Sequence, residues 1–303
     1  MSDTDPGAPP AYFIRGQKLT APRLAPGLYL VATPIGHLGD VTLRALDTLA
    51  AADLVACEDT RVTRKLLARY GIDRPLMAYH EHSGPEARRR ILAALAAGQA
   101  VALASDAGTP LISDPGYQLV QEALAAGGTI VPVPGASAVM AALAAAGLPT
   151  DTFLFGGFLP AKAAARASRL QELAAVPASL VFFESPRRLR TALADAARIL
   201  GGGRGAVVCR EMTKLHETFE RGSLAELAER FAGAAPKGEI VVVVAPPEEG
   251  RAEISQADLD GRLAEALAGH SIRDASDRVA AETGLPRRTV YQRALALKGE
   301  GGR

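Results

Sequence analysis

Four short loops carry most of the residue types that could do chemistry in this chain. They are "TPIGHLGD" (33–40), "CEDTR" (57–61), "SDAGTPLISDPG" (105–116) and "VPGASA" (133–138). Each loop follows an apolar run that predicts a buried strand. Ligands of open α/β sheets bind outside the carboxyl ends of the strands, so we expect these loops to line one site. A single Gly-rich loop would indicate only a tight turn, but four loops at one sheet edge favour ligand binding.

The third loop is the richest in polar groups. Gly108 and Gly116 would let the backbone approach a ligand closely. The loop also supplies three hydroxyls and two carboxylates, on Ser105, Thr109, Ser113, Asp106 and Asp114. We therefore expect a ligand that binds through backbone groups, hydroxyls and carboxylates.

Two series of alternating strands and helices must position these loops. The first series has predicted strands at 27–34, 54–59, 100–104 and 129–133, with Ala-rich helices between them. The second has predicted strands at 152–156, 179–184, 205–209 and 239–245, with helices at 160–174, 186–199 and 223–233. This alternation predicts an α/β fold whose first sheet is mostly parallel. The second series predicts a separate α/β unit that could include antiparallel strands.

The chain divides into four parts on this pattern. Residues 1–25 are polar and Pro-rich, so we expect a disordered leader. Residues 26–133 and 134–247 are the two predicted α/β domains, and residues 248–303 form a linker and a small helical module. Within the module, two helical patterns flank a "TGLP" turn, which is typical of a helix-turn-helix.

Charge is balanced over the chain but not within its tail. The 303 residues contain 34 Lys+Arg and 33 Asp+Glu, a formal net charge of +1, so binding to a polyanion would need a local basic patch. Such a patch is predicted at residues 286–303, which hold five Lys or Arg against one Glu. The alternative for this module is a packing or dimer-forming helical cap.

Several function classes are excluded or disfavoured. The two cysteines, Cys57 and Cys209, provide no disulfide framework or zinc spacing, and they suit a reducing cytoplasm. No metal site is predicted. No apolar run reaches roughly 18 residues, so we expect no membrane span. The chain contains no P-loop and no GxGxxG motif, and "PGASAV" only approximates the GxSxG of serine hydrolases.

Seven motifs together resemble one known family. Besides the four loops, they are "GFLP" (157–160), "FFESPRR" (182–188) and "CREMTKLHE" (209–217). The set resembles the ribosomal RNA small subunit methyltransferase I family, the 2′-O-ribose cytidine methyltransferases of the tetrapyrrole methylase superfamily. The resemblance runs from about residue 27 to 245 and extends to the helical tail. Tetrapyrrole methylases usually carry GxGxGD and GDP where this chain has "TPIGHLGD" and "GTP", which favours the RNA enzyme.

The resemblance implies a bilobal, class III methyltransferase that binds S-adenosylmethionine in the cleft between two α/β domains. Pro34 would lie near the methyl-donor end of the cofactor. The other implied cofactor-binding residues come from the third and fourth loops: Gly108, Thr109, Pro110, Ile112, Ser113, Ala136, Ser137 and Ala138.

Transfer of a methyl group from a sulfonium to a ribose hydroxyl needs in-line positioning and a base. The candidate catalytic residues are the charged groups at the predicted strand ends: Glu58, Asp59, Asp106, Glu184 and Lys214, with Glu211 and His216 nearby. The sequence does not single out one of them as the base.

The resemblance also implies the partners. The substrate would be a cytidine in the decoding region of 16S rRNA, on the assembled small subunit, and the enzyme a cytoplasmic homodimer with no membrane or DNA partner. Predicted RNA contacts are Arg61, Arg187, Arg210, Arg287, Arg288 and Arg293. Two alternatives stay open, namely a tetrapyrrole methylase acting on a corrin or sirohaem precursor, and a DNA-binding regulator with an α/β sensor domain.

Overall fold

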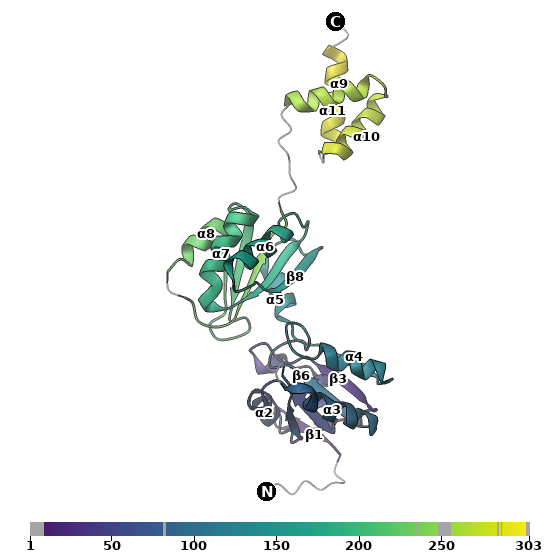
Figure 1. Cartoon of the computed structure of the whole chain (residues 1–303), viewed down its shortest axis with the longest axis vertical. Coiled ribbons are helices and arrows are strands. Elements are labelled where there is room, and N and C mark those ends of the chain that lie inside the picture. The colour runs from purple at the N-terminus through teal and green to yellow at the C-terminus, as the bar shows by residue number, and fades with distance from the viewer. Residues whose placement is uncertain are drawn as a thin grey trace.

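The computed structural model describes residues 9–80, 83–233, 235–247, 256–283, 285 and 287–300. It contains two five-stranded sheets, each with helices on both faces, and a cluster of C-terminal helices (Figure 1). The predicted arrangement of two α/β domains and a helical module is confirmed.

The first sheet is entirely parallel and has the order β5-β4-β6-β3-β7. Its strands are β3 (Gly27–Val31), β4 (Leu54–Cys57), β5 (Leu76–Ala78), β6 (Ala100–Ala104) and β7 (Ile130–Val133). Helices α1 (Leu43–Ala51) and α2 (Thr60–Arg69) pack on one face, and α3 (Gly84–Ala96) and α4 (Tyr117–Ala125) pack on the other. Since both faces are covered, the strands are almost continuously apolar.

The second sheet is mixed and has the order β11-β10-β12-β9-β8. Its strands are β8 (Phe153–Phe158), β9 (Ser179–Glu184), β10 (Gly205–Arg210), β11 (Thr218–Ser223) and β12 (Ile240–Val244). Only β8 and β9 pair in parallel, and the other neighbours are antiparallel. Helix α5 (Ala138–Ala146) covers one face, while α6 (Ala163–Leu173), α7 (Pro186–Leu200) and α8 (Leu224–Arg230) cover the other. We keep residue 134 as the proposed domain boundary, since the first sheet ends at Val133.

The expectation of a disordered leader is wrong for residues 11–20. Strands β1 (Ala11–Ile14) and β2 (Gln17–Thr20) form an antiparallel hairpin. Tyr12 is buried in the core of the first domain, and the backbone N–H of Phe13 donates to the carbonyl of Tyr70 at 2.8 Å. Burial of one aromatic ring therefore outweighs the polar composition of the segment. Residues 1–8 of the predicted leader lie outside the described residues.

The C-terminal module consists of α9 (Gln256–Leu267), α10 (Ile272–Thr283) and α11 (Arg287–Glu300). These helices share a small apolar core that includes Leu263, Val279 and Val290. Arg293 joins α11 to α9, because two of its nitrogens donate to the carboxylate of Asp260 at 2.6 Å. Within the described part of the chain, no helix is long and apolar enough to cross a membrane.

Candidate active site

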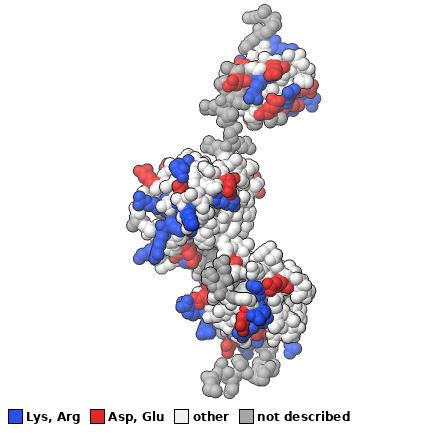
Figure 2. Space-filling view, viewed as in Figure 1, with Lys and Arg blue, Asp and Glu red and all other residues white. Residues whose placement is uncertain are grey.

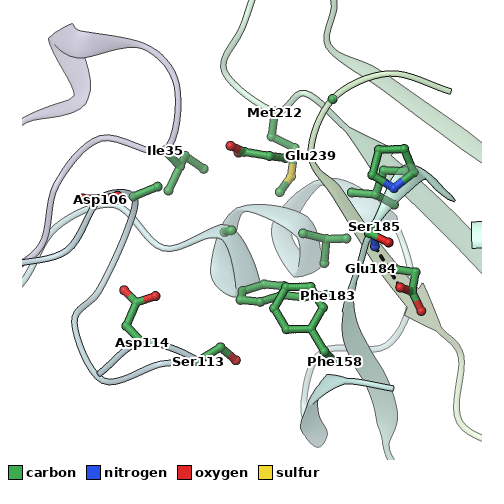
Figure 3. Close-up of a pocket in the computed structure, with 16 residues that line it drawn as sticks. Ile35, Asp106, Ser113, Asp114, Phe158, Phe183, Glu184, Ser185, Met212 and Glu239 are labelled. Carbon is green, nitrogen blue, oxygen red and sulfur yellow. Dashed lines mark hydrogen bonds between the residues drawn. The ribbon is translucent and has the colours of Figure 1, made fainter. Parts of the chain in front are cut away.

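A cavity of about 400 Å³ lies between the loops of the two sheets. Figure 3 shows Ser113 and Asp114 on one wall and Phe158 and Phe183 on the facing wall. Its volume falls in the range of pockets for small organic ligands. The lining residues come from both domains: Ile35, Asp106, Ala107, Ser113, Asp114, Ala138, Phe158, Phe183, Glu184, Ser185, Pro186, Met212, Gly238, Glu239, Ile240 and Val241.

The loop of residues 105–116 forms the first wall and is held from two sides. Thr33 and Gly108 exchange two backbone hydrogen bonds of 2.9 and 3.0 Å, which tie this loop to the segment after β3. The Thr109 hydroxyl donates to the carbonyl of Ala136 at 3.3 Å, which ties it to the loop before α5. Leu111 and Ser113 adopt positive φ angles of 71° and 63°, a backbone conformation that residues other than glycine rarely adopt. Such local strain is common at binding sites.

The second wall is apolar and aromatic. The rings of Phe158 and Phe183 meet edge to face with centroids 5.6 Å apart. Met212 and the segment 238–241 complete this wall. Gly238 has a φ of +98°, and a Cβ there would lie 2.4 Å from the Glu211 side chain, so glycine is required at this position.

The two walls meet through a short contact between the segment after β3 and the segment after β10. The backbone N–H of His37 donates to the Thr213 hydroxyl at 3.0 Å. Gly36 lies so close to this segment that a Cβ would be 2.5 Å from Cγ of Lys214. Ile35 packs with Met212 in the core beneath α5. This contact sets the relative position of the two domains at the cavity.

Three carboxylates gather at the first wall. Burial raises the pKa of Asp106 and of Asp114, and one buried oxygen of Asp114 has no hydrogen-bond partner among the described residues. Burial also raises the pKa of Glu58, and the charges of Asp106 and Asp114 add to this shift. A partly desolvated carboxylate with one free oxygen in a cavity is suited to bind a polar ligand.

Replacing Asp114 with Asn is expected to stabilise the ligand-free protein more at neutral pH than at pH 4. Because the folded-state pKa lies above the unfolded-state value, the free energy of unfolding falls as pH rises from about 4 through the raised pKa. Asn cannot ionise, so the variant lacks this loss. Urea unfolding at both pH values measures the effect, with the exposed Asp151→Asn as a control; an equal change at both pH values would contradict the assigned cause.

The predicted catalytic residues differ in their position relative to the cavity. Asp106 lines the cavity, and the backbone N–H of Asp59 donates to it at 2.9 Å. Asp59 itself is the N-cap of α2 and accepts from the Arg61 side chain, which lowers its pKa to about 2. Glu58 belongs to the acidic cluster but is not among the lining residues. Asp59 is not among the residues that line the cavity, and its carboxylate accepts from the backbone and side chain of Arg61.

Glu184 and Lys214 are also held by ion pairs. The Glu184 carboxylate accepts from the backbone N–H of Ser185 at 2.8 Å and lies 3.3 Å from Arg188 of α7. It is turned away from Asp106 and Asp114 (Figure 3). Lys214 Nζ lies 3.0 Å from Glu211 and 3.1 Å from Glu239, and these carboxylates help to raise its pKa despite partial burial. Lys214 is therefore a paired cation beside Glu239, which lines the cavity.

The predicted cofactor residues divide between two cavities. Ser113 and Ala138 line the cavity described above, whereas Thr109, Pro110, Ile112 and Ser137 line a neighbouring apolar cavity of about 470 Å³. Ser137 also caps α5. The remaining predicted residues lie in the strand-end segments that connect the two walls: Pro34, Gly108 and Ala136.

The predicted RNA-binding residues are brought together only in part. Arg61 pairs with Asp59, Arg210 bonds Thr218 and the Lys237 carbonyl, and Arg187 is exposed near the cavity-lining Pro186. In the module, Arg287 pairs with Asp277 and Arg293 with Asp260, while Arg288 is exposed. The face of the module seen in Figure 2 accordingly carries both signs of charge. The basic excess of the tail is thus partly neutralised within the module.

Several lining residues were missed at the sequence level. Phe158, Phe183 and Met212 lie within the quoted motifs, but nothing in those motifs marks them as wall residues. Gly238 and Glu239 lie outside every motif. Strand alternation could have assigned Phe183 to one face of the sheet and Glu184 to the other.

Comparison with known proteins shows which family has this architecture. A family model described as tetrapyrrole (corrin/porphyrin) methylases matches residues 27–228, and one described as the RsmI C-terminal HTH domain matches residues 253–298. A cobalt precorrin-4 methyltransferase aligns with a TM-score of 0.55 at 18% identity, covering 72% of this chain and 94% of the other. A uroporphyrin-III C-methyltransferase from Thermus thermophilus, complexed with S-adenosyl homocysteine, aligns with a TM-score of 0.52 at 22% identity, covering 72% and 96%. The fold and the interdomain pocket thus define a tetrapyrrole-methylase-type methyltransferase.

Curated relatives narrow the assignment. A Mesorhizobium japonicum protein named "Ribosomal RNA small subunit methyltransferase I" is 54% identical over 286 residues, covering 94% of this chain and 97% of the relative. A Pseudomonas aeruginosa protein of the same name is 47% identical over 277 residues, covering 90% and 98%. The chain belongs to the ribosomal RNA small subunit methyltransferase I family.

The cofactor of this methyltransferase is S-adenosylmethionine, and the cavity fits it chemically. The cofactor carries a cationic sulfonium, an amino group, hydroxyls and an adenine. Asp106, Asp114 and Glu239 offer carboxylates to the cationic and hydroxyl groups, and Phe158 and Phe183 offer an aromatic wall.

Proposed function

We propose that this protein transfers a methyl group from S-adenosylmethionine to the ribose 2′-oxygen of a cytidine in the decoding region of 16S rRNA. The observation that carries the proposal is the interdomain cavity with its acidic and aromatic walls. The chain that forms it matches curated relatives named "Ribosomal RNA small subunit methyltransferase I" over nearly its whole length. The cofactor supplies the electrophilic methyl group. The protein holds the acceptor hydroxyl in line and removes its proton.

We propose that the assembled small subunit is the substrate. A chain with a net charge of +1 gains little long-range attraction to RNA, so a shaped target would supply most of the affinity. The proposed setting is the cytoplasm.

Methyl transfer from labelled S-adenosylmethionine to small subunits that lack ribose methylation tests the proposal, with nucleoside mass spectrometry of the product. 2′-O-methylcytidine is the expected product. Incorporation into a macrocyclic precursor instead of the subunit would favour a tetrapyrrole methylase.

Asp106 is the proposed base among the three clustered carboxylates. It lines the cavity, and its raised pKa makes it a better proton acceptor than an ordinary carboxylate. Asp106→Asn retains an oxygen for the Asp59 N–H and is expected to lower kcat by about 100-fold or more, the usual contribution of a base. The matched variant Glu58→Gln alters the same cluster without altering the lining and is expected to lower kcat far less. If Asp106→Asn weakens cofactor binding and leaves kcat unchanged, Asp106 binds the cofactor instead.

The C-terminal module is proposed to dock the ribosomal substrate. The described residues of α9–α11 form a hydrophobic core separate from those of the two α/β domains. Removing residues 250–303 is therefore expected to leave the affinity for S-adenosylmethionine within about twofold of that of the full-length protein. The KM for small subunits is expected to rise at least tenfold, because the exposed Arg288 and its neighbours are removed. Isothermal titration and steady-state methylation measure the two quantities. Full activity of the truncated chain would give the module a structural role.

A homodimer is the proposed assembly. Met140, Phe153 and Ile112 are large apolar side chains that remain 55%, 40% and 43% exposed around the second cavity. Exposed apolar clusters of this kind favour a protein partner. Sedimentation equilibrium would test this proposal, and a monomer at micromolar concentration would contradict it.

A further inference from the structure

A groove runs along the first domain beside the cofactor cavity. It consists of two cavities, of about 450 and 390 Å³, that lie next to each other because both are lined by Gly39, Arg69 and Tyr70. We call this feature the α2 groove, because Arg69 is the last residue of α2. The hairpin residues Phe13 and Arg15 line its far end.

The near end of the α2 groove is separated from the cofactor cavity by a thin wall. Ile35 lines the cofactor cavity, and the next residue, Gly36, lines the groove. Met212 and Thr213 alternate in the same way on the opposite segment. A chain lying in the groove would therefore pass directly beside the cofactor cavity.

The charged side chains of the α2 groove are cationic. Arg15 and Arg69 line it and are exposed, and no ion pair to either is found in the described part of the chain. Lys65 is also exposed and lies four residues before Arg69, so both share one side of α2 about 6 Å apart. Among the described lining residues there is no carboxylate; Asp40 lies at the rim, 4.0 Å from His37.

Apolar and aromatic side chains lie between these cations. Leu215 is 92% exposed at the near end, and Phe13 and Leu38 are 44% and 41% exposed farther along. The Tyr70 hydroxyl donates to the carbonyl of Leu38 at 2.8 Å, which fixes the floor. Cations beside exposed aromatic side chains such as Phe13 are typical of surfaces that bind single-stranded nucleic acid.

We propose that the α2 groove binds the single-stranded RNA segment next to the methylated nucleotide. Arg15, Lys65 and Arg69 contact its phosphates, and Phe13, Leu38 and Leu215 contact its bases. This inference rests on the proposed function, since it extends the RNA substrate from the site of methyl transfer onto the first domain. It adds proposed RNA contacts at Arg15 and Arg69, two residues that lie outside the seven motifs of the sequence analysis.

The double variant Arg15→Glu/Arg69→Glu tests the proposal in the full-length protein. The matched control is Arg89→Glu/Arg90→Glu, which reverses two exposed charges on α3, on the opposite face of the first sheet. We expect the KM for small subunits to rise at least tenfold in the groove variant and to change less than twofold in the control. The slope of log affinity against log salt concentration should become shallower by about 1.4 in the groove variant, because each lost phosphate contact on a single strand contributes about 0.7.

The affinity for S-adenosylmethionine is measured in parallel and is expected to stay unchanged. If both double variants methylate subunits like the parent, the α2 groove does not bind RNA and the inference is overturned. A loss of cofactor affinity in the groove variant alone would overturn it too, since the groove would then support the cofactor cavity. If the parent protein itself methylates no subunit, the proposed function fails, independently of the groove.

Discussion

Valine in place of Gly108 is expected to weaken binding of S-adenosylmethionine by about 100-fold or more. Gly108 has a φ of +81°, and a Cβ there would lie 3.3 Å from Ile35, which lines the cofactor cavity. A β-branched residue in this conformation costs about 1–3 kcal/mol and would break the paired hydrogen bonds to Thr33. The loop that forms the first wall would then move. Isothermal titration with the cofactor measures the loss.

Gly98→Val is the matched control for this variant. Gly98 has a similar φ of +78°, but no atom of the described residues lies within 4 Å of the position of its Cβ. It connects α3 to β6, away from the lining residues. Its backbone strain is comparable, so a similar loss of stability without loss of cofactor affinity is expected. Unchanged affinity in Gly108→Val would show that the loop of residues 105–116 does not hold the cofactor.

Alanine in place of Gly36 is expected to lower kcat/KM for methylation by about 100-fold. A Cβ at this position would lie 2.5 Å from Lys214 and 3.0 Å from the carbonyl of Met212, so the contact between the two domains has to open. A displacement of about 1 Å between reacting groups is enough for a loss of this size. Steady-state kinetics with small subunits measures it.

Gly39→Ala changes the same segment without opening the contact. Its Cβ would meet only the His37 ring, which is 70% exposed and can move away. We expect kcat to stay within a few-fold of the parent, and any effect of the added methyl group in the α2 groove, which Gly39 lines, to appear in KM. Equal losses in both variants would mean that the segment after β3 acts through its own flexibility and not through the domain contact.

The predicted fold followed from two patterns in the local sequence. Apolar runs ending in Gly, Pro or Asp identified strands such as β6 and β7, and Ala-rich stretches identified the helices between them. The β1–β2 hairpin was not predicted, because its stability depends on the burial of Tyr12 against a distant part of the chain. Strand β5 has only three residues, too few for a periodic signal.

The site was predictable up to the loops and no further. The loops identified the sheet edge correctly, but the direction of each side chain depends on strand parity and on partners far along the chain. Phe183 and Glu184 are adjacent and both line the cavity, yet the ring of Phe183 packs against Phe158 while the carboxylate of Glu184 pairs with Arg188. Arg293 counts as a free cation in the sequence, but its partner Asp260 precedes it by 33 residues. Counting charges therefore overestimated the basic surface of the tail.

The separate core of the C-terminal module affects how stability should be measured. Among the described residues, Leu263, Val279 and Val290 belong to a core made by the α9–α11 module alone, so the module is expected to melt independently of the two α/β domains. A single melting temperature would then average two transitions. Cofactor binding should raise only the melting temperature of the α/β domains. The unchanged melting temperature of the module would then serve as an internal reference in the same sample.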